Sequence, residues 1–299
     1  MKLLLSDVYK FYRNNCAINN FNMEFTSGIY GLLGPNGAGK STIMKMLTDN
    51  EKPTTGIITI DGTSIYEMGK DYRAIVGYMP QQQKMYAYFT GKEFLGYMCA
   101  LKGLDKKRTR KEIDNIVSEL NLNDIISKKI GTCSGGMKQR LLLAQSLIGE
   151  PSILLLDEPT AGLDPMERIR VRNYISKIAK DKIVIIATHV AQDIEYIAKE
   201  LVFLKKGKIV ESGTAEKILS KIDGKIYDVE IHEKYIDEIL SSKQIVSLYG
   251  MKDNIRARVI LDKKENDERF IKMEKVNPNI EDLYLYIYDE EKLFNGKSI

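Results

Sequence analysis

Short, almost wholly apolar runs recur along the first two thirds of the chain. Residues 29–33, 153–156 and 183–187 read IYGLL, ILLL and IVIIA, each bounded by polar or small residues. Runs of this length are typical of strands buried on both faces of a parallel sheet. Residues 42–48 are compatible with a helix that follows the first of these strands. The pattern predicts an α/β fold, because parallel strands need helical connections that cover the sheet.

A helical segment interrupts this core pattern. Residues 91–101 are largely apolar, and residues 108–120 place Ile113 and Ile116 on one stripe. Spacings of three and four residues are typical of a helix with one buried face. We therefore expect a helical subdomain over about residues 82–148.

The pattern changes again beyond residue 220. Residues 225–231 and 254–261 alternate between apolar and polar like half-buried strands, and residues 233–240 are compatible with a helix. We predict two domains, a larger one over residues 1–220 and a small α+β extension over residues 221–299.

The extension has a helix signal near its end. Asn277 or Asn279 can cap a helix, with Pro278 close to its start. The apolar face of that helix would consist of Ile280, Leu283 and Ile287.

Composition and charge narrow the class of protein. The 299 residues include 43% hydrophobic and 29% charged positions, which is typical of a folded globular chain. A net charge of +4 from 45 basic and 41 acidic residues gives no reason to expect a nucleic-acid partner. Cys16, Cys99 and Cys133 lack metal-ligand spacing, which indicates a reducing compartment. With neither an export signal nor an apolar run of about 18 residues, we expect a cytoplasmic chain that reaches a membrane only through a partner.

A glycine-rich segment, GPNGAGKST at residues 34–42, connects the first predicted strand to the helix. The pattern GxxxxGK[ST] in that context holds a nucleoside triphosphate, because backbone N–H groups and the positive helix end point inward. We expect Lys40 to reach the β and γ phosphates and Ser41 to ligate Mg²⁺. The other nucleotide-binding candidates in this loop are Gly34, Asn36, Gly37, Gly39 and Thr42.

Polar side chains follow two other predicted strands. Asp157 and Glu158 come directly after residues 153–156, and His189 follows residues 183–187. Ligands of open α/β sheets bind at the carboxyl ends of the strands, so these side chains should meet at one edge. We expect Asp157 to hold Mg²⁺ through its water shell and Glu158 to orient the attacking water. A neutral His189 could donate a hydrogen bond to the γ-phosphate.

A third motif lies between the first two. In residues 132–151, Ser134 and two glycines precede an amphipathic helix. Ser134 can cap that helix, while Gly136 lets a phosphate approach the backbone. Taken alone, the motif fits a helix cap and a ligand site equally well.

In this order the motifs resemble those of the ATP-binding-cassette (ABC) ATPases, through residues 1–220. The resemblance implies an α/β P-loop core with an antiparallel β subdomain and a helical subdomain. The phosphate loop, the strand ending in Asp157 and Glu158, and the SGG segment are similar to that family's Walker A, Walker B and signature motifs. The resemblance implies that Tyr12 stacks on adenine and that Gln81 contacts both Mg²⁺ and the water. The neighbouring Gln82 and Gln83 leave the register of that glutamine open by one residue.

The signature departs from the family's usual LSGGQ, since this chain reads CSGGM. Ser134 and Gly136, which would face the triphosphate, are retained. Met137 lacks the amide of the usual glutamine, so hydrogen bonds of that glutamine are not carried over. Cys133 is either a reactive thiol at a helix start or a small apolar substitute for leucine.

The resemblance also implies partners. In the family, the signature of one cassette closes over the triphosphate of another, so a second ATPase chain, either an identical copy or a paralogue, completes each site. The extension resembles those of ATPases that serve two-part drug, antibiotic or peptide exporters. We therefore expect an ATPase at the inner face of the cell membrane that energises a separately encoded membrane permease.

Two questions remain open at the level of sequence. Met85, Tyr86, Tyr88 and Phe89 either receive the permease or pack within the helical subdomain. The alternative function is a soluble ABC ATPase in DNA repair or on ribosomes. The chain has no second cassette, zinc-type cysteine pairs or strong basic run, which argues against that alternative.

Overall fold

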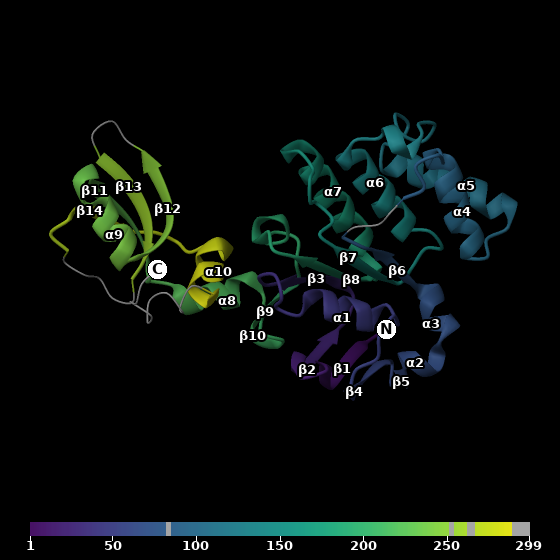
Figure 1. The fold of residues 1–299 in the computed structure, drawn as a ribbon, viewed down its shortest axis with the longest axis horizontal. Helices are drawn as coiled ribbons and strands as arrows, with labels where there is room; N and C mark the ends of the chain where they lie inside the picture. The colour runs from purple at the N-terminus through teal and green to yellow at the C-terminus, as the bar shows by residue number, and fades with distance from the viewer. Residues whose placement is uncertain (82–84, 251–253, 262–266, 289–299) are drawn as a thin grey trace. The chain divides into compact units, whose positions relative to one another are not determined.

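The computed structural model describes residues 1–81, 85–250, 254–261 and 267–288 (Figure 1). The chain divides into two compact units, residues 1–211 and 212–299. This division does not say which unit carries which activity. The assignment of an ATPase domain to residues 1–220 and an accessory domain to residues 221–299 stays a prediction.

A six-stranded sheet forms the centre of the first unit. Its strand order is β10-β9-β3-β8-β7-β6. The pairs β3–β8, β3–β9, β7–β8 and β6–β7 are parallel. The strands are β3 (Gly28–Leu33), β6 (Val76–Met79), β7 (Ile153–Asp157), β8 (Ile183–Thr188), β9 (Glu200–Lys205) and β10 (Lys208–Gly213).

The three apolar runs of the sequence form the neighbouring strands β3, β7 and β8. Every residue of β7 and β8 is buried, as is β3 from Ile29 onward. Helices cover both faces: Figure 1 shows α6 and α7 on one side of this sheet and α1 on the other. The predicted α/β fold with a parallel sheet is confirmed.

Strand register brings the predicted motifs to one edge. Leu33 pairs with Thr188, and Asp157 pairs with Ala187, one residue earlier in β8. Because all three strands run in the same direction, the segments that follow them emerge side by side.

A second, antiparallel sheet lies in the same unit, with strand order β2-β1-β4-β5. Helix α1 packs between the two sheets, and Ile43 and Met44 are buried in a core shared with Leu5, Phe21 and Leu155. These strands are β1 (Leu3–Tyr12), β2 (Asn15–Phe25), β4 (Thr55–Ile60) and β5 (Thr63–Ser64).

Helices α4, α5 and α6 form the predicted helical subdomain. Helix α4 starts at a capping box, in which Thr90 accepts from the Glu93 backbone and the Glu93 carboxylate accepts from the Thr90 backbone. Ile113 and Ile116 are the buried residues of α5, in line with the predicted stripe. The helices of the first unit are α1 (Lys40–Leu47), α2 (Ile65–Met68), α3 (Lys70–Ile75), α4 (Gly91–Leu101), α5 (Lys106–Glu119), α6 (Gly135–Ser146) and α7 (Pro165–Ile178).

Two of the aromatic residues after the Gln81 region pack within the helical subdomain. Tyr86 stacks on Phe89 at 5.0 Å, and both rings contact Tyr97 of α4 edge-on. Tyr88, by contrast, is 89% exposed. Packing within the subdomain therefore explains Tyr86 and Phe89 but not Tyr88.

The second unit is a four-stranded antiparallel sheet of order β12-β13-β11-β14, with helices. Val229, Ala257 and Val259 form its core with Ile239 of α9. The predicted α+β extension is confirmed. Its elements are α8 (Ala215–Leu219), β11 (Ile226–His232), α9 (Ile236–Ser242), β12 (Gln244–Gly250), β13 (Asn254–Ile260), β14 (Phe270–Lys275) and α10 (Ile280–Tyr288).

Strands β12 and β14 were absent from the sequence prediction. Both form edges of the sheet, and the pairing of β12 shifts register between Ile245 and Ser247. A register shift breaks the two-residue alternation on which strand prediction depends. Helix α10 begins as expected, with the Asn279 side chain accepting from the Asp282 backbone.

No helix within residues 1–81, 85–250, 254–261 and 267–288 combines the length and the apolar character that a membrane crossing needs.

Candidate functional site

The phosphate loop requires glycine at the position where it enters α1. Gly39 has φ 112° and directly precedes α1. A Cβ atom there would lie 2.7 Å from Ile18 Cδ1 and 3.0 Å from the Ala17 carbonyl oxygen of β2. Because other residues rarely adopt this φ and no space remains for a side chain, only glycine fits.

Lys40 lies within this loop. Its ammonium donates to the carbonyl oxygens of Gly34 and Pro35, and its side chain is buried. Burial lowers the pKa of Lys40, while the charges of Glu158 and Asp157 raise it. A buried cation at the start of a helix is a strong attractor for phosphate oxygens.

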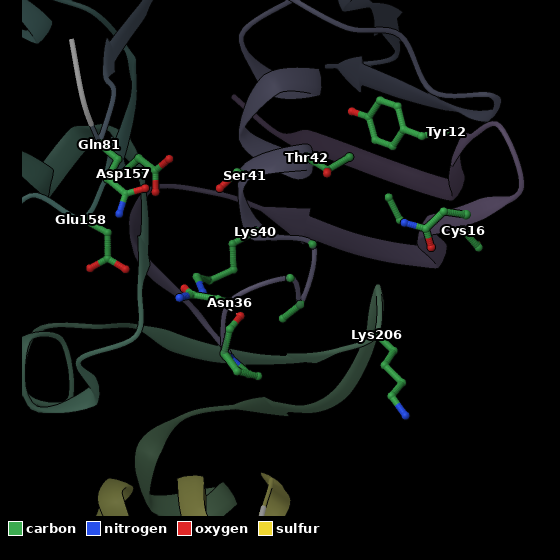
Figure 2. A pocket seen from close by; sticks show the side chains of 16 residues that line it. Tyr12, Cys16, Asn36, Lys40, Ser41, Thr42, Gln81, Asp157, Glu158 and Lys206 are labelled. Carbon is green, nitrogen blue, oxygen red and sulfur yellow. Dashed lines mark hydrogen bonds between the residues drawn. The ribbon is translucent and has the colours of Figure 1, made fainter.

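A cavity of about 550 Å³ opens above the loop. Ten of the predicted site residues line it: Tyr12, Asn36, Gly37, Gly39, Lys40, Ser41, Thr42, Gln81, Asp157 and Glu158. Figure 2 shows Gln81, Asp157 and Glu158 on one side, Tyr12 on the other, and Lys40 and Ser41 between them. The cavity thus has an acidic end and an aromatic end. Gln82 and Gln83, the other candidates for the register of Gln81, lie outside the described residues.

Asp157 is the last residue of β7 and is 6% exposed. Burial raises the pKa of this carboxyl to about 6, with a further contribution from Glu158, whereas Lys40 opposes the shift. A desolvated carboxylate beside a second carboxylate is stabilised by a nearby cation.

Glu158 is equally buried, but it is hydrogen-bonded on both carboxylate oxygens. Oε2 accepts from the Thr188 hydroxyl at 3.0 Å, and Oε1 accepts from the His189 backbone N–H at 3.1 Å. Oε1 also lies 2.6 Å from His189 Nδ1. The predicted meeting of Glu158 and His189 at one sheet edge is thus observed, although His189 does not line the cavity.

Tyr12 lies at the aromatic end. Its hydroxyl donates to Glu51, and the Lys10 ammonium lies 5.1 Å from the centre of its ring. The side chain is 39% exposed. A ring held by its edge in this way leaves a face for stacking, as adenine recognition would require.

The signature residues lie outside the cavity lining. Ser134 caps α6 by accepting from the Met137 backbone N–H at 3.2 Å. Cys133 is buried and its thiol donates to the Lys129 carbonyl, which favours its interpretation as a small apolar substitute for leucine. Within this chain, then, Ser134 has the structure of a helix cap.

Several residues at the site were not predicted. Asn15, Cys16, Ala17 and Lys206 line the cavity from β2 and from the turn between β9 and β10. No motif marks these positions, because strand pairing and turn packing place them there. Gln139 was not predicted either: it lies outside the cavity lining, and its side-chain amide donates to the Glu158 carbonyl oxygen at 2.8 Å.

Comparisons with known proteins agree with this geometry. The profile of the ABC transporter family matches residues 18–161. Uncharacterized ABC transporter ATP-binding protein YxlF of Bacillus subtilis (strain 168) is 30% identical over 296 residues, which cover 95% of this chain and 99% of that protein. Nod factor export ATP-binding protein I of Rhizobium etli is 29% identical over 298 residues, covering 96% and 93% of the two chains.

A solved structure described as the ATP binding subunit of an ABC transporter is similar, with a TM-score of 0.67 and 25% identity. The match covers 74% of this chain and 93% of that one. Fold, phosphate loop and full-length relatives all agree, and the chain belongs to the ATP-binding proteins of the ABC transporter family.

Proposed function

We propose that this chain hydrolyses ATP to energise a separately encoded membrane permease that works as an exporter. The observation that carries the proposal is the cavity with a phosphate loop at its centre, two carboxylates at one end and an aromatic ring at the other. This order of groups along the cavity suits the γ-phosphate at the acidic end, the rest of the triphosphate at the loop and the adenine base at the aromatic end.

The triphosphate would occupy the loop of residues 34–39. The backbone N–H groups of Asn36, Gly37 and Gly39 and the start of α1 would bind its oxygens. Lys40 would exchange its carbonyl contacts for the β and γ phosphates, whose negative charge would compensate the buried ammonium. Thr42 would assist at the phosphates, and Tyr12 would stack on adenine.

A magnesium ion fits the acidic end. Ser41, Gln81 and Asp157 offer a hydroxyl, an amide and a buried carboxylate that line one wall of the cavity. Oxygen donors of these kinds suit Mg²⁺, which neutralises phosphate charge when bound. The raised pKa of Asp157 supports this role, because the desolvated carboxylate gains from a cation nearby.

Glu158 would act as the general base that orients the attacking water. It lies at the acidic end, and its contacts with Thr188 and His189 hold the carboxylate in place. His189, whose side chain is 56% exposed, would face the γ-phosphate when a second chain covers the site. Proton transfer to a carboxylate so placed contributes about a hundredfold or more to such a rate.

Substitution of Glu158 tests this chemistry. We expect Glu158→Gln to bind ATP like the wild type but to hydrolyse it at least about a hundredfold more slowly, because the amide cannot take the proton. Nucleotide binding by fluorescence titration and phosphate release give the two readouts. Lys40→Ala serves as a contrast, since it should weaken binding itself. Normal turnover by Glu158→Gln would remove the base from this proposal.

The permease would dock in a second cavity of about 590 Å³, located among α3, α4, β6 and α6. Met98 and Leu101 give it an apolar wall, and Leu101 is 65% exposed. Lys70 and Lys102 add positive charge, whereas Arg73 is paired with Asp49, and the described residues that line the cavity include no carboxylate. This combination suits a short amphipathic helix of the permease that carries an acidic side chain.

Co-purification from membranes tests the membrane partner. We expect the tagged chain to retain a protein with several membrane spans, and Leu101→Asp to lose it. Ile57→Asp, at an apolar residue of β4 that is 57% exposed, serves as the matched control. Recovery of ribosomes or a DNA-repair complex instead would favour the soluble alternative. Export is supported by the full-length similarity to Nod factor export ATP-binding protein I.

A further inference from the structure

Glu158 has an unusual backbone conformation for a buried residue. Its φ is 52°, in the left-handed region. Of the nine non-glycine residues with positive φ in the described part of the chain, Glu158 is the one that is buried. A residue with a Cβ atom adopts this conformation at a cost, so its surroundings must hold it there.

Three hydrogen bonds hold the peptide groups of Glu158. Its N–H donates to the Ala187 carbonyl of β8 at 2.8 Å. Its carbonyl accepts from the Ala161 N–H of its own turn at 3.1 Å and from the Gln139 side-chain amide at 2.8 Å. The first bond belongs to the sheet and the second to the turn, whereas the third comes from a different helix.

That helix is α6, which Ser134 caps. Gln139 is 8% exposed and lies five residues after this cap, so about 7.5 Å along the same helix axis. A buried amide that bonds to a carbonyl is directional, so a shift of α6 changes the hydrogen bond on Glu158. The signature end of the helix and the backbone of Glu158 are thereby connected through one side chain.

We propose that Gln139 is a positioning residue for Glu158. By holding the Glu158 carbonyl, it stabilises the left-handed backbone that directs the carboxylate toward Thr188 and His189. The inference rests on the proposed role of Glu158 as the general base. Ser134, on the same helix, would close over the triphosphate bound by a second chain. A movement of α6 on that closure would reach Glu158 of this chain through Gln139, so the base of one site responds when the other site closes.

Gln139→Met tests the role, because methionine has a similar length but no donor. We expect kcat for ATP hydrolysis to fall about five- to tenfold, the factor that one net hydrogen bond supplies, with KM for ATP within about twofold. Gln139→Asn keeps the amide but is too short to reach, so it should behave in the same way.

Ser146→Ala provides the matched control on the same helix. Ser146 is also buried, but its hydroxyl bonds to the Leu143 carbonyl within α6 and has no bond to the site among the contacts described. We expect it to lower the unfolding temperature without changing kcat. If both Gln139 variants keep wild-type kcat, the proposal is wrong.

A double-mutant cycle separates positioning from general damage to the helix. In the Glu158→Gln background the positioned carboxylate is gone, so Gln139→Met should not lower the residual rate further. An equal fold reduction in both backgrounds, or a rise in KM alone, would overturn the positioning role. Wild-type turnover by Glu158→Gln alone would instead refute the proposed base, so the two failures are distinguishable.

Discussion

At the scale of single residues, the site places opposite charges where little water reaches them. Lys40, Asp157 and Glu158 are each less than a tenth exposed. Burial lowers the pKa of the ammonium and raises that of Asp157, and the opposite charges partly offset both effects. Burying such charged groups lowers the stability of the protein without ligand, but it prepares the site to bind a charged ligand. Arrangements of this kind are common at functional sites.

The loss of folding stability caused by burying Asp157 should depend on pH. Its pKa in the folded protein, about 6, lies above the ordinary value of 3.8, so the folded state binds this proton more tightly than the unfolded chain. The ionised carboxyl therefore destabilises the folded protein. This effect is complete above pH 6, decreases as the pH falls, and is absent below about pH 4. Asp157→Asn should be more stable than the wild type by about 1–3 kcal/mol at pH 8 and equal to it near pH 4.

Urea unfolding with a chelator and without nucleotide measures this difference at both pH values. The chelator is needed because a bound cation would compensate the carboxylate charge. Lower stability of Asp157→Asn at pH 8 would contradict the assigned effect of burial.

The cysteines provide a second prediction at this scale. Cys16 lines the nucleotide cavity and is half-buried, whereas Cys99 is fully buried and burial raises the pKa of its thiol to about 11. A maleimide should therefore label Cys16 first in the native protein, and saturating ATP should slow that reaction. Mass spectrometry of peptides identifies the labelled residue. If the rate of Cys16 labelling is the same with and without ATP, the nucleotide does not bind in this cavity.

At the scale of elements, local hydrogen bonds determine where the functional helices begin. Thr90, Asp105, Ser134 and Asp164 accept backbone bonds at the starts of α4, α5, α6 and α7. Each such cap stabilises a helix by about 1 kcal/mol. Of these caps only Ser134 was predicted from sequence; α4 and α5 were predicted to within a few residues from their apolar positions, and α7 was not predicted.

Helix α10 depends in addition on a buried ion pair. Asp282 is fully buried and accepts two hydrogen bonds from Arg258 of β13, at 2.8 and 2.7 Å. Asp282→Ala should destabilise the second unit by about 3–5 kcal/mol, because it removes the close carboxylate partner of the largely buried Arg258 and leaves Asp228, at 3.9 Å, as the nearest described negative charge. Thermal unfolding of the full chain, followed by limited proteolysis, measures the effect.

Replacing both members of this pair is the control. Arg258→Met combined with Asp282→Leu removes the charges together, so most of the lost stability should return. If the double variant is as unstable as Asp282→Ala, lost packing rather than an unpaired charge is the cause.

At the scale of the whole molecule, the signature and the phosphate loop do not complete one site within a chain. Ser134 and Gly136 do not line the cavity that contains Lys40. In the proposed site, the signature would come from a second chain, either a copy or a paralogue.

Mixing two inactive variants tests whether copies of this chain suffice. Lys40→Ala and Ser134→Glu should each abolish hydrolysis, the second by placing a negative charge against the triphosphate. In a mixed dimer, one site combines an intact Lys40 with an intact Ser134. Partial recovery of ATPase activity, up to a quarter of the wild type for random pairing of equal amounts, is the expected result. No recovery would indicate a paralogue as the second chain.

The sequence by itself determined the three buried parallel strands β3, β7 and β8, the phosphate loop and the placing of Asp157, Glu158 and His189 at one sheet edge. These follow from local patterns: apolar runs of strand length, glycine spacing and the rule that parallel strands end together. The Ser134 cap of α6, the Asn279 cap of α10 and the α+β extension were accessible for the same reason, whereas β12 was hidden by its register shift.

Only the tertiary structure decided which other residues meet these motifs. Cys16 and Lys206 reach the nucleotide cavity through strand pairing and a turn, and Gln139 reaches Glu158 from a helix that is 19 residues earlier in sequence. The left-handed backbone of Glu158 was equally hidden. The physical reason is that a local pattern specifies an element and its buried face, but contacts between distant elements depend on how their side chains pack together.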